Sequence, residues 1–213
     1  MLSCGEKLEV RNWNLLRYED ALSKQKTLVN ERLAGRTGDS LVFVEHPAVV
    51  TIGRSGNNGD LCVPEEVLRK MGVELFYTDR GGRATFHGPG QMVVYPIIKL
   101  KQPDLHWYVH TLLESLAFVI RMYGLNPVEK KGFPGLWVNG GKIASIGISV
   151  KRWVTYHGIA LNVNLDLNTF NWIIPCGNPD EKITSMRKEL GRSVNLQNIL
   201  ALFEKKFQGF FAT

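Results

Sequence analysis

A predicted β-hairpin near residue 140 restricts the fold of this chain more than any other feature of its sequence. Asn-Gly pairs favour the tight turn whose twist matches that of two antiparallel strands. Asn139-Gly140-Gly141 stands between an apolar segment at residues 136–138 and a small and apolar segment at residues 142–150. Other strand-like segments lie at residues 8–13, 41–45, 48–52, 75–78, 92–100 and 153–163. The sequence therefore predicts a mixed, largely antiparallel central sheet.

Segments of helical character are interspersed with these strands. Apolar residues recur three or four positions apart over residues 18–33, 105–123 and 194–207, which is the spacing of one helix face. Residues 64–71 begin with proline, which suits the first turn of a short helix. Pro96 interrupts the segment 92–100, and a proline in a strand indicates either a bulge or an edge position. Helices flanking a sheet in this order indicate an α+β fold.

The composition is that of an ordinary globular protein. Of the 213 residues, 44% are hydrophobic and 22% charged, so we expect one domain spanning residues 1–213. No window approaches the ~20 apolar residues of a membrane span, and the first twenty residues lack the apolar core of a signal peptide. We therefore expect a protein of the cytoplasm with no membrane partner.

The cysteines and the charge balance narrow the function classes further. Cys4, Cys62 and Cys176 are odd in number, widely separated and without a CxxC pair, so neither a disulfide framework nor a zinc site is predicted. The net charge of +6 favours acidic partners such as nucleic acid, an acidic protein or an anionic carrier. The chain has no basic helix with interleaved aromatic residues and no zinc-finger or RNA-recognition signature. We therefore expect no nucleic acid among its partners.

A glycine-rich segment at residues 79–91 is a candidate binding loop. Glycine allows a ligand or another backbone to approach closely, and exposed amide groups can face a carbonyl or an anion. The segment is neither the GxGxxG fingerprint nor a P-loop, because no Lys and Ser/Thr follow Gly88 and Gly90. Two tight turns flanking a strand at residues 83–86 would explain the glycines equally well. His87 is either a structural histidine or a pocket-lining one.

Cys176 and Lys142 are candidates for nucleophilic chemistry, each with a plainer alternative. Cys176 lies in a turn formed by Pro175, Gly177 and Pro179, after an apolar run at residues 170–174. It is either a nucleophile fixed on a cleft wall or a buried and inert thiol. Lys142 follows the hairpin turn, where a lysine usually points into water. The small and apolar residues 143–148 beside it would instead leave room for a ligand.

Four sequence motifs occur in order along most of the chain. They are RGGRATFHGPGQ at residues 80–91, PGLWV with KIASIG at residues 134–138 and 142–147, HGIALNVN at residues 157–164, and PCG at residues 175–177. In this order and spacing they resemble the lipoyl(octanoyl) transferase family. The family usually has a tyrosine where Phe86 stands and a leucine where Met186 stands, so a role for the missing hydroxyl is in doubt here.

The resemblance implies a catalytic domain with the biotin/lipoate protein ligase-like fold. It also implies that Cys176 carries the acyl group, that Lys142 is its basic partner, and that no cofactor or metal is required. Oxyanion donors are expected among backbone amides of the 80–90 loop or of Gly177. The residues implied to line the acyl pocket are Arg80, Gly81, Gly82, Arg83, Ala84, Thr85, Phe86, His87, Ser145, Ile146, Gly147, Gly158, Ile159 and Ala160.

The reaction implied by the resemblance takes an octanoyl group from octanoyl-acyl carrier protein to a lysine of a lipoyl domain. The acceptor would be a lipoyl domain of a 2-oxoacid dehydrogenase complex or the glycine cleavage H protein, and the enzyme is expected to be a monomer. One alternative is an ATP-dependent lipoate or biotin protein ligase, which shares the fold but uses no cysteine nucleophile. The other is a binding module for a carrier or a lipoyl domain, without catalysis.

Overall fold

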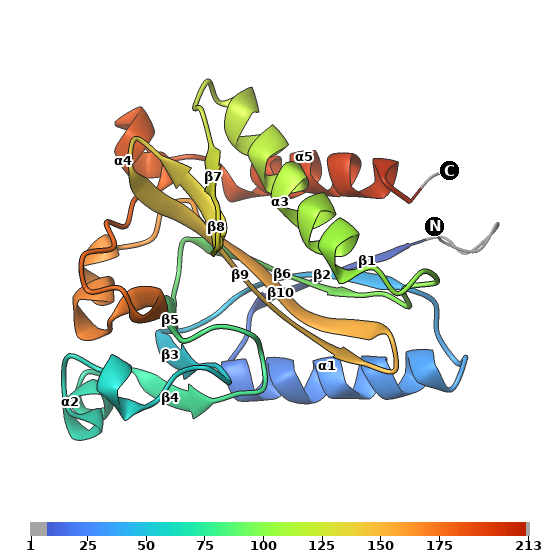
Figure 1. Ribbon diagram of the computed structural model, residues 1–213, viewed down its shortest axis with the longest axis horizontal. Coiled ribbons are helices and arrows are strands. Elements are labelled where there is room, and N and C mark those ends of the chain that lie inside the picture. The colour runs from blue at the N-terminus through green and yellow to red at the C-terminus, as the bar shows by residue number, and fades with distance from the viewer. Residues whose placement is uncertain (1–7, 212–213) are drawn as a thin grey trace.

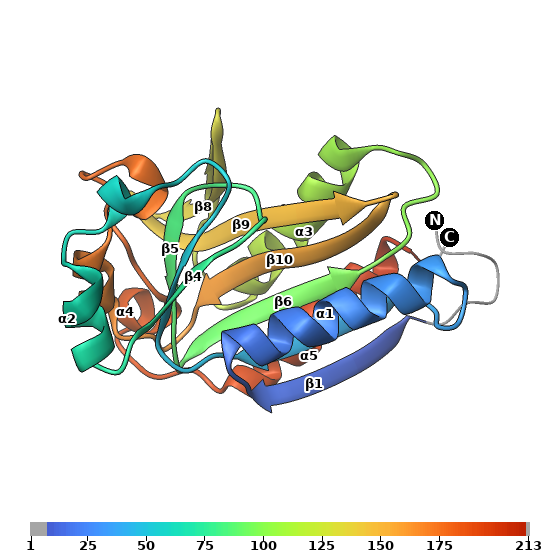
Figure 2. The same ribbon diagram turned by 90° about the horizontal axis from the view of Figure 1, so that it is seen from below.

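A seven-stranded sheet forms the centre of the computed structural model, which describes residues 8–211 (Figures 1 and 2). The strand order is β1-β2-β6-β10-β9-β8-β7. β1 and β2 are parallel, and all other neighbouring pairs are antiparallel. The predicted α+β fold with a largely antiparallel sheet is confirmed. The strands of this sheet are β1 (Glu9–Leu15), β2 (Ser40–Glu45), β6 (Gln91–Ile97), β7 (Val128–Lys130), β8 (Phe133–Val138), β9 (Gly141–Lys151) and β10 (Val154–Asn162).

Helices cover both faces of this sheet. α3 (Leu105–Met122) and α5 (Leu196–Gly209) pack on one face, where they share an apolar core with β6, β9 and β10. α1 (Tyr18–Leu33) covers the other face at β6 and β10 (Figure 2). The three long helices therefore lie where the apolar periodicity of the sequence predicts them. A short helix, α4 (Met186–Leu190), was not predicted.

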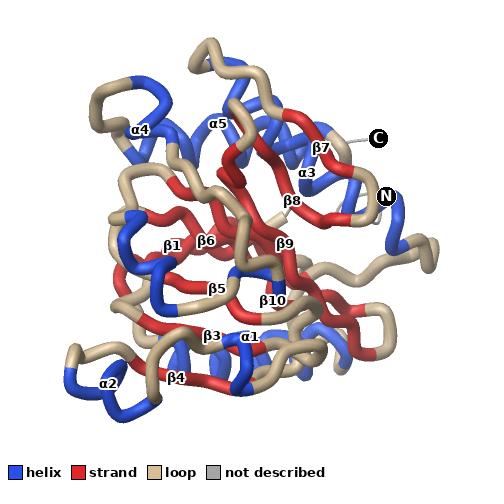
Figure 3. The backbone as a smooth tube through the Cα atoms, turned by 60° about the vertical axis from the view of Figure 1, so that its left-hand side comes forward, coloured by secondary structure: helices blue, strands red, loops and turns tan. Residues whose placement is uncertain are grey.

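A second, three-stranded sheet lies beside the first. Its order is β4-β3-β5, with β3 (Val49–Ile52) parallel to β4 (Glu74–Tyr77) and antiparallel to β5 (Ala84–His87). The short helix α2 (Glu65–Lys70) connects β3 to β4. In Figure 3, β5 lies on the side of this small sheet that faces β6 and β10 of the main sheet. Residues from both sheets can therefore line a common space.

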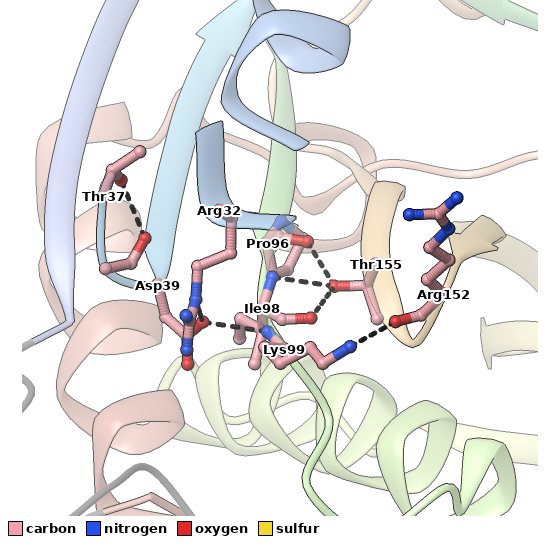
Figure 4. A network of polar contacts seen from close by, with 9 residues as sticks. Arg32, Thr37, Asp39, Pro96, Ile98, Lys99, Arg152 and Thr155 are labelled. Carbon is pink, nitrogen blue, oxygen red and sulfur yellow. Dashed lines mark hydrogen bonds and ion pairs between the residues drawn. The ribbon is translucent and has the colours of Figure 1, made fainter. Parts of the chain in front are cut away.

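Pro96 lies in a central strand, so the alternative of an edge position is wrong: β6 runs between β2 and β10. The ladder between β6 and β10 stops at Val94 and Ile159, before the proline. Beyond that point the Thr155 hydroxyl donates to Pro96 O at 2.7 Å and accepts the Ile98 N–H at 3.1 Å (Figure 4). The Thr155 hydroxyl thus bonds the Pro96 carbonyl and the Ile98 N–H in the part of β6 where the regular ladder to β10 has stopped.

The predicted hairpin joins β8 to β9. Asn139 and Gly140 have φ of 49° and 81°, as a type I′ turn requires at both central positions, and Val138 pairs with Gly141. The turn therefore sets the register that carries Lys142 into the first part of β9.

Candidate active site

Lys142 and Cys176 meet in the folded chain although 34 residues separate them. Lys142 Nζ lies 3.0 Å from Cys176 Sγ. The backbone of Lys142 is paired with the segment that follows the cysteine, because its N–H donates to Lys182 O at 2.7 Å and its carbonyl accepts the Thr184 N–H at 2.9 Å. The Lys142 residue is 3% exposed, so the alternative of a lysine that points into water is wrong. The strand register and this pairing together bring the ammonium to the sulfur.

The cysteine lies in a tight turn with an uncommon backbone conformation. Cys176 has φ of 55° and Gly177 has φ of 75°, and non-glycine residues seldom adopt such left-handed angles except where the surroundings enforce them. Within the turn, the Gly177 N–H donates to Ile174 O at 3.1 Å and the Asn178 N–H donates to Pro175 O at 3.0 Å. The Gly177 amide, one expected oxyanion donor, therefore already has an acceptor.

The ammonium of Lys142 rests on an aromatic ring. Its Nζ lies 5.0 Å from the ring centroid of Trp137, and Lys130 Nζ lies 4.8 Å from the same ring. Trp137 is fully buried, and its indole N–H donates to Glu181 Oε1 at 2.8 Å. A ring face attracts a cation, so the Trp137 ring supports the end of the Lys142 side chain. This arrangement gives the Cys176 sulfur a cationic hydrogen-bond donor.

A cavity of about 240 Å³ adjoins this pair, between the main sheet and β5. Its floor is formed by small residues of two neighbouring strands, since Ser145 lies opposite Ala160 and Gly147 lies opposite Gly158. Without bulky side chains at these four positions, an extended chain can lie directly over this part of the sheet. Further lining residues come from β5, β6, β8, β9, β10, α1 and the loops, and they are Tyr18, Arg80, Gly82, Arg83, Ala84, Thr85, His87, Val93, Tyr95, Gly132, Phe133, Pro134, Ile146, His157 and Ile159.

Two of the residues expected to line the pocket lie elsewhere. Successive side chains of a strand point to opposite faces, so Phe86 points away from Thr85 and His87. Its ring packs against Phe170 and Trp172 at centroid distances of 6.0 and 5.8 Å. Gly81 is likewise outside the lining, and its N–H donates to Ile148 O at 3.0 Å. The place of Phe86 also means that a hydroxyl at this position would not reach the cavity.

Sequence reasoning missed several lining residues. Val93 and Tyr95 lie two apart on β6 and so share the face that borders the cavity. The period-two pattern of this strand could have identified them. Tyr18 at the start of α1 and Phe133 at the start of β8 carry no motif, and only the three-dimensional structure places them here.

Arg80 is a buried cation that ties the glycine-rich loop together. It is 8% exposed, and its guanidinium donates to the carbonyls of Thr51 at 2.6 Å, Arg83 at 2.8 Å and Gly81 at 3.0 Å. Burial lowers the pKa of Arg80, and nearby Tyr18 and Cys176 oppose this shift. These contacts fix the loop so that its residues border the cavity.

Two buried histidines near the cavity are neutral at pH 7. Burial lowers the pKa of His46 to about 4 and that of His87 to about 3. His46 Nδ1–H donates to Leu16 O at 2.7 Å, so its Nε2 accepts from the Tyr95 hydroxyl at 2.7 Å. His87 Nδ1 bonds to Gln91 Oε1 at 2.7 Å. Both rings therefore contribute shape and hydrogen bonds to this region, without a charge.

The described residues hold free cysteines, but neither a metal-binding group nor a membrane-spanning helix. Within residues 8–211, no group of three or more His, Cys, Asp or Glu is placed to hold a metal ion. No helix in the same range has the length and apolar character of a membrane span. Cys62 and Cys176 are free thiols, whereas Cys4 lies outside the described residues.

Comparison with known proteins places this geometry in a family. The family described as "Lipoyl protein ligase A/B catalytic domain" matches residues 17–208. An octanoyltransferase of Rubrobacter xylanophilus is 44% identical over 195 residues, which cover 90% of this chain and 88% of that protein. An octanoyltransferase of Caldicellulosiruptor saccharolyticus is 41% identical and covers 96% of this chain and 89% of its own length.

Solved structures of low sequence identity share the fold. A lipoate-protein ligase A bound with ATP has a TM-score of 0.81 at 15% identity, with 97% of this chain and 86% of that one covered. The biotin protein ligase of Aquifex aeolicus has a TM-score of 0.58 at 13% identity, with 94% and 69% covered. The chain therefore has the biotin/lipoate protein ligase-like fold, belongs to the lipoyl(octanoyl) transferase family within the lipoyl protein ligase A/B catalytic domain family, and is an acyltransferase.

Proposed function

We propose that this enzyme transfers an octanoyl group from octanoyl-acyl carrier protein to the lysine ε-amine of a lipoyl domain, through a thioester on Cys176. The observation that carries the proposal is the 3.0 Å contact between Lys142 Nζ and Cys176 Sγ beside a cavity whose floor is formed by small residues. The family relationship supports the substrate class, since the relatives are octanoyltransferases.

The first step exchanges one thioester for another. The thiolate of Cys176, stabilised by the ammonium of Lys142, attacks the octanoyl carbonyl carbon, and a carbon–sulfur bond forms. The bond from that carbon to the carrier sulfur then breaks, and the departing thiolate takes a proton from Lys142. This exchange is nearly isoenergetic and needs no activation by a nucleotide, because the donor is already a thioester.

The second step forms an amide and restores the enzyme. The neutral Lys142 amine left by the first step accepts the proton of the attacking lysine amine, which bonds to the octanoyl carbonyl carbon. The bond to Cys176 Sγ breaks, so the sulfur leaves as a thiolate beside a newly charged ammonium. An amide is more stable than a thioester, and this step therefore drives the transfer forward.

The cavity has two tasks in this scheme. Burial of about seven methylenes at ~0.8 kcal/mol each stabilises the bound chain by on the order of 5 kcal/mol, which favours medium chains over very short ones. The walls also exclude water from the thioester, which slows hydrolysis. Of the expected oxyanion donors, the amides of Gly82 and Arg83 remain candidates, since both residues line the cavity.

The expected acceptors are lipoyl domains of 2-oxoacid dehydrogenase complexes or the glycine cleavage H protein. Lipoate-protein ligase A and this chain share a fold, which supports an acceptor of this class. We place the reaction in the cytoplasm, a reducing setting that suits the free thiols Cys62 and Cys176.

A transfer assay separates this function from ATP-dependent ligation. We expect octanoylation of a lipoyl domain from octanoyl-acyl carrier protein without ATP, and its loss in Cys176→Ser. Transfer of free octanoate that requires ATP and persists in Cys176→Ser would instead identify a ligase. Binding of the carrier without any transfer would identify a binding module.

A further inference from the structure

An ion pair between Arg83 and Asp60 contacts the turn that carries Cys176. Arg83 donates to Asp60 Oδ1 through Nε at 3.0 Å and through Nη2 at 2.6 Å. Asp60 Oδ2 accepts the Asn57 N–H at 3.2 Å. The Asp60 side chain is 1% exposed and that of Arg83 is 39% exposed, so a buried carboxylate holds a guanidinium that reaches the cavity wall.

This pair contacts the chain on both sides of the cysteine. Before Cys176, the Ile174 N–H donates to the backbone oxygen of Asp60 at 2.7 Å. After Cys176, the Arg83 side chain lies against Gly177 so closely that an added Cβ there would come within 2.5 Å of Nε and 2.8 Å of Cζ. The ends of the turn therefore rest on the two members of one ion pair.

The turn needs such support because its own bonds are few. The left-handed conformation of Cys176, with φ of 55°, is unfavourable for a residue other than glycine and persists only where the surroundings enforce it. Within the turn itself, the N–H groups of Gly177 and Asn178 make the two hydrogen bonds described above. A relaxed turn would move the sulfur away from Lys142 Nζ, and a shift of about 1 Å is enough to cost ~10²-fold in rate.

We propose that Asp60 and Arg83 are positioning residues that hold the Cys176 turn in the conformation that places Sγ against Lys142. Arg83 thus acts through the nucleophile turn, in addition to bordering the acyl cavity. The effect on acyl transfer rests on the proposed function. The positioning of the thiol, in contrast, can be measured without any acyl substrate.

The test measures the alkylation rate of Cys176 by iodoacetamide in a Cys4→Ser/Cys62→Ser background. We expect Arg83→Gln and Asp60→Asn each to lower this rate about tenfold. Arg83→Lys keeps the charge but offers a single donor group, and it should retain more of the rate than Arg83→Gln. Arg121→Gln is the matched control, because it removes an exposed arginine paired with Glu114, and it should alkylate at the parental rate.

A double-mutant comparison separates positioning from general loosening of the fold. In a Lys142→Ala background no ammonium lies beside Cys176 Sγ, so the position of the turn no longer affects that contact. Arg83→Gln should therefore change the alkylation rate less than twofold there. A tenfold loss in that background as well, or parental rates in both Arg83→Gln and Asp60→Asn, would overturn the proposal. If the parent alkylates as expected but forms no acyl-enzyme, the proposed function fails and the positioning inference stands.

Discussion

Replacement of Gly135 by alanine tests whether the walls around Lys142 set the position of its ammonium. Gly135 lies on β8, where it pairs with Ser145 of β9 and lies close to the end of the Lys142 side chain, with φ of 145°. An added Cβ would come within 2.5 Å of Ala144 O, 2.8 Å of Lys142 Cε and 3.4 Å of Lys142 Nζ. The Ala144 carbonyl belongs to a strand and cannot recede easily, whereas the end of the lysine side chain can. The substitution should therefore displace Lys142 from Cys176.

Two magnitudes follow from this geometry. The backbone conformation is strained for alanine by about 1–3 kcal/mol, which in a chain of this size lowers Tm by roughly 2–4 °C per kcal/mol. Relief of the contact with Cε needs a shift of about 1 Å, and such a shift in a catalytic group lowers the rate by ~10²-fold. Activity should thus fall by ~10²-fold, together with a lowered Tm to which the 2.5 Å approach to the Ala144 carbonyl also contributes.

The assay compares kcat/KM for octanoyl transfer with thermal melting followed by circular dichroism. Gly140→Ala is the matched control, since Gly140 also has a positive φ, 81°, but its added Cβ would meet nothing within 4 Å. We expect Gly140→Ala to melt slightly earlier and to transfer normally. If Gly135→Ala transferred within threefold of the parent, the idea that this wall fixes Lys142 would be refuted.

Three further predictions concern the same region. Lys142→Ala should lower transfer by on the order of 10²-fold or more while its circular dichroism spectrum is unchanged, and a near-normal rate would remove Lys142 from the mechanism. Trp137→Phe keeps a ring under Lys142 but removes the N–H that bonds to Glu181. The free energy of unfolding in a urea titration should therefore fall by about 1 kcal/mol, and transfer activity should fall less than in Lys142→Ala. Equal losses of activity in the two variants would contradict this. The pKa values of His46 and His87 in the folded protein, about 4 and about 3, lie below the unfolded value of about 6.5. Unfolding therefore takes up protons. The stability that is present above pH 6.5 is lost as the pH falls toward the folded pKa values. Each histidine should reduce the free energy of unfolding by roughly 2 kcal/mol between pH 7 and pH 5, measured by urea titration, and a His87→Gln variant that loses as much as the parent would exclude His87 as a cause.

Local patterns predicted most of the elements but not their partners. The Asn139-Gly140 turn and the apolar spacing of residues 105–123 arise from short-range physics, and both elements are present as expected. Pro96 shows the limit, because its carbonyl and the Ile98 N–H are bonded by the Thr155 hydroxyl, more than fifty residues away in sequence. A strand sequence does not reveal which distant side chain will bond the backbone where a ladder stops.

The site was predictable where a motif spans it and unpredictable where long-range contacts build it. Cys176 and Lys142 were candidates from sequence, but the burial of Lys142 depends on backbone bonds to Lys182 and Thr184. Phe86 lies inside a pocket motif, yet strand alternation directs it to the opposite face. Asp60 carries no sequence signal at all, because its importance lies in contacts to Arg83 and Ile174.

The central claim is that Cys176 carries the acyl group, and intact-protein mass spectrometry tests it most directly. Purified enzyme is incubated with octanoyl-acyl carrier protein, without acceptor, and weighed. We predict a mass increase of one octanoyl group in the parent, its absence in Cys176→Ala, and its loss when a lipoyl domain is added. Transfer to the lipoyl domain by Cys176→Ala at the parental rate, or an adduct that forms on that variant, would contradict the account.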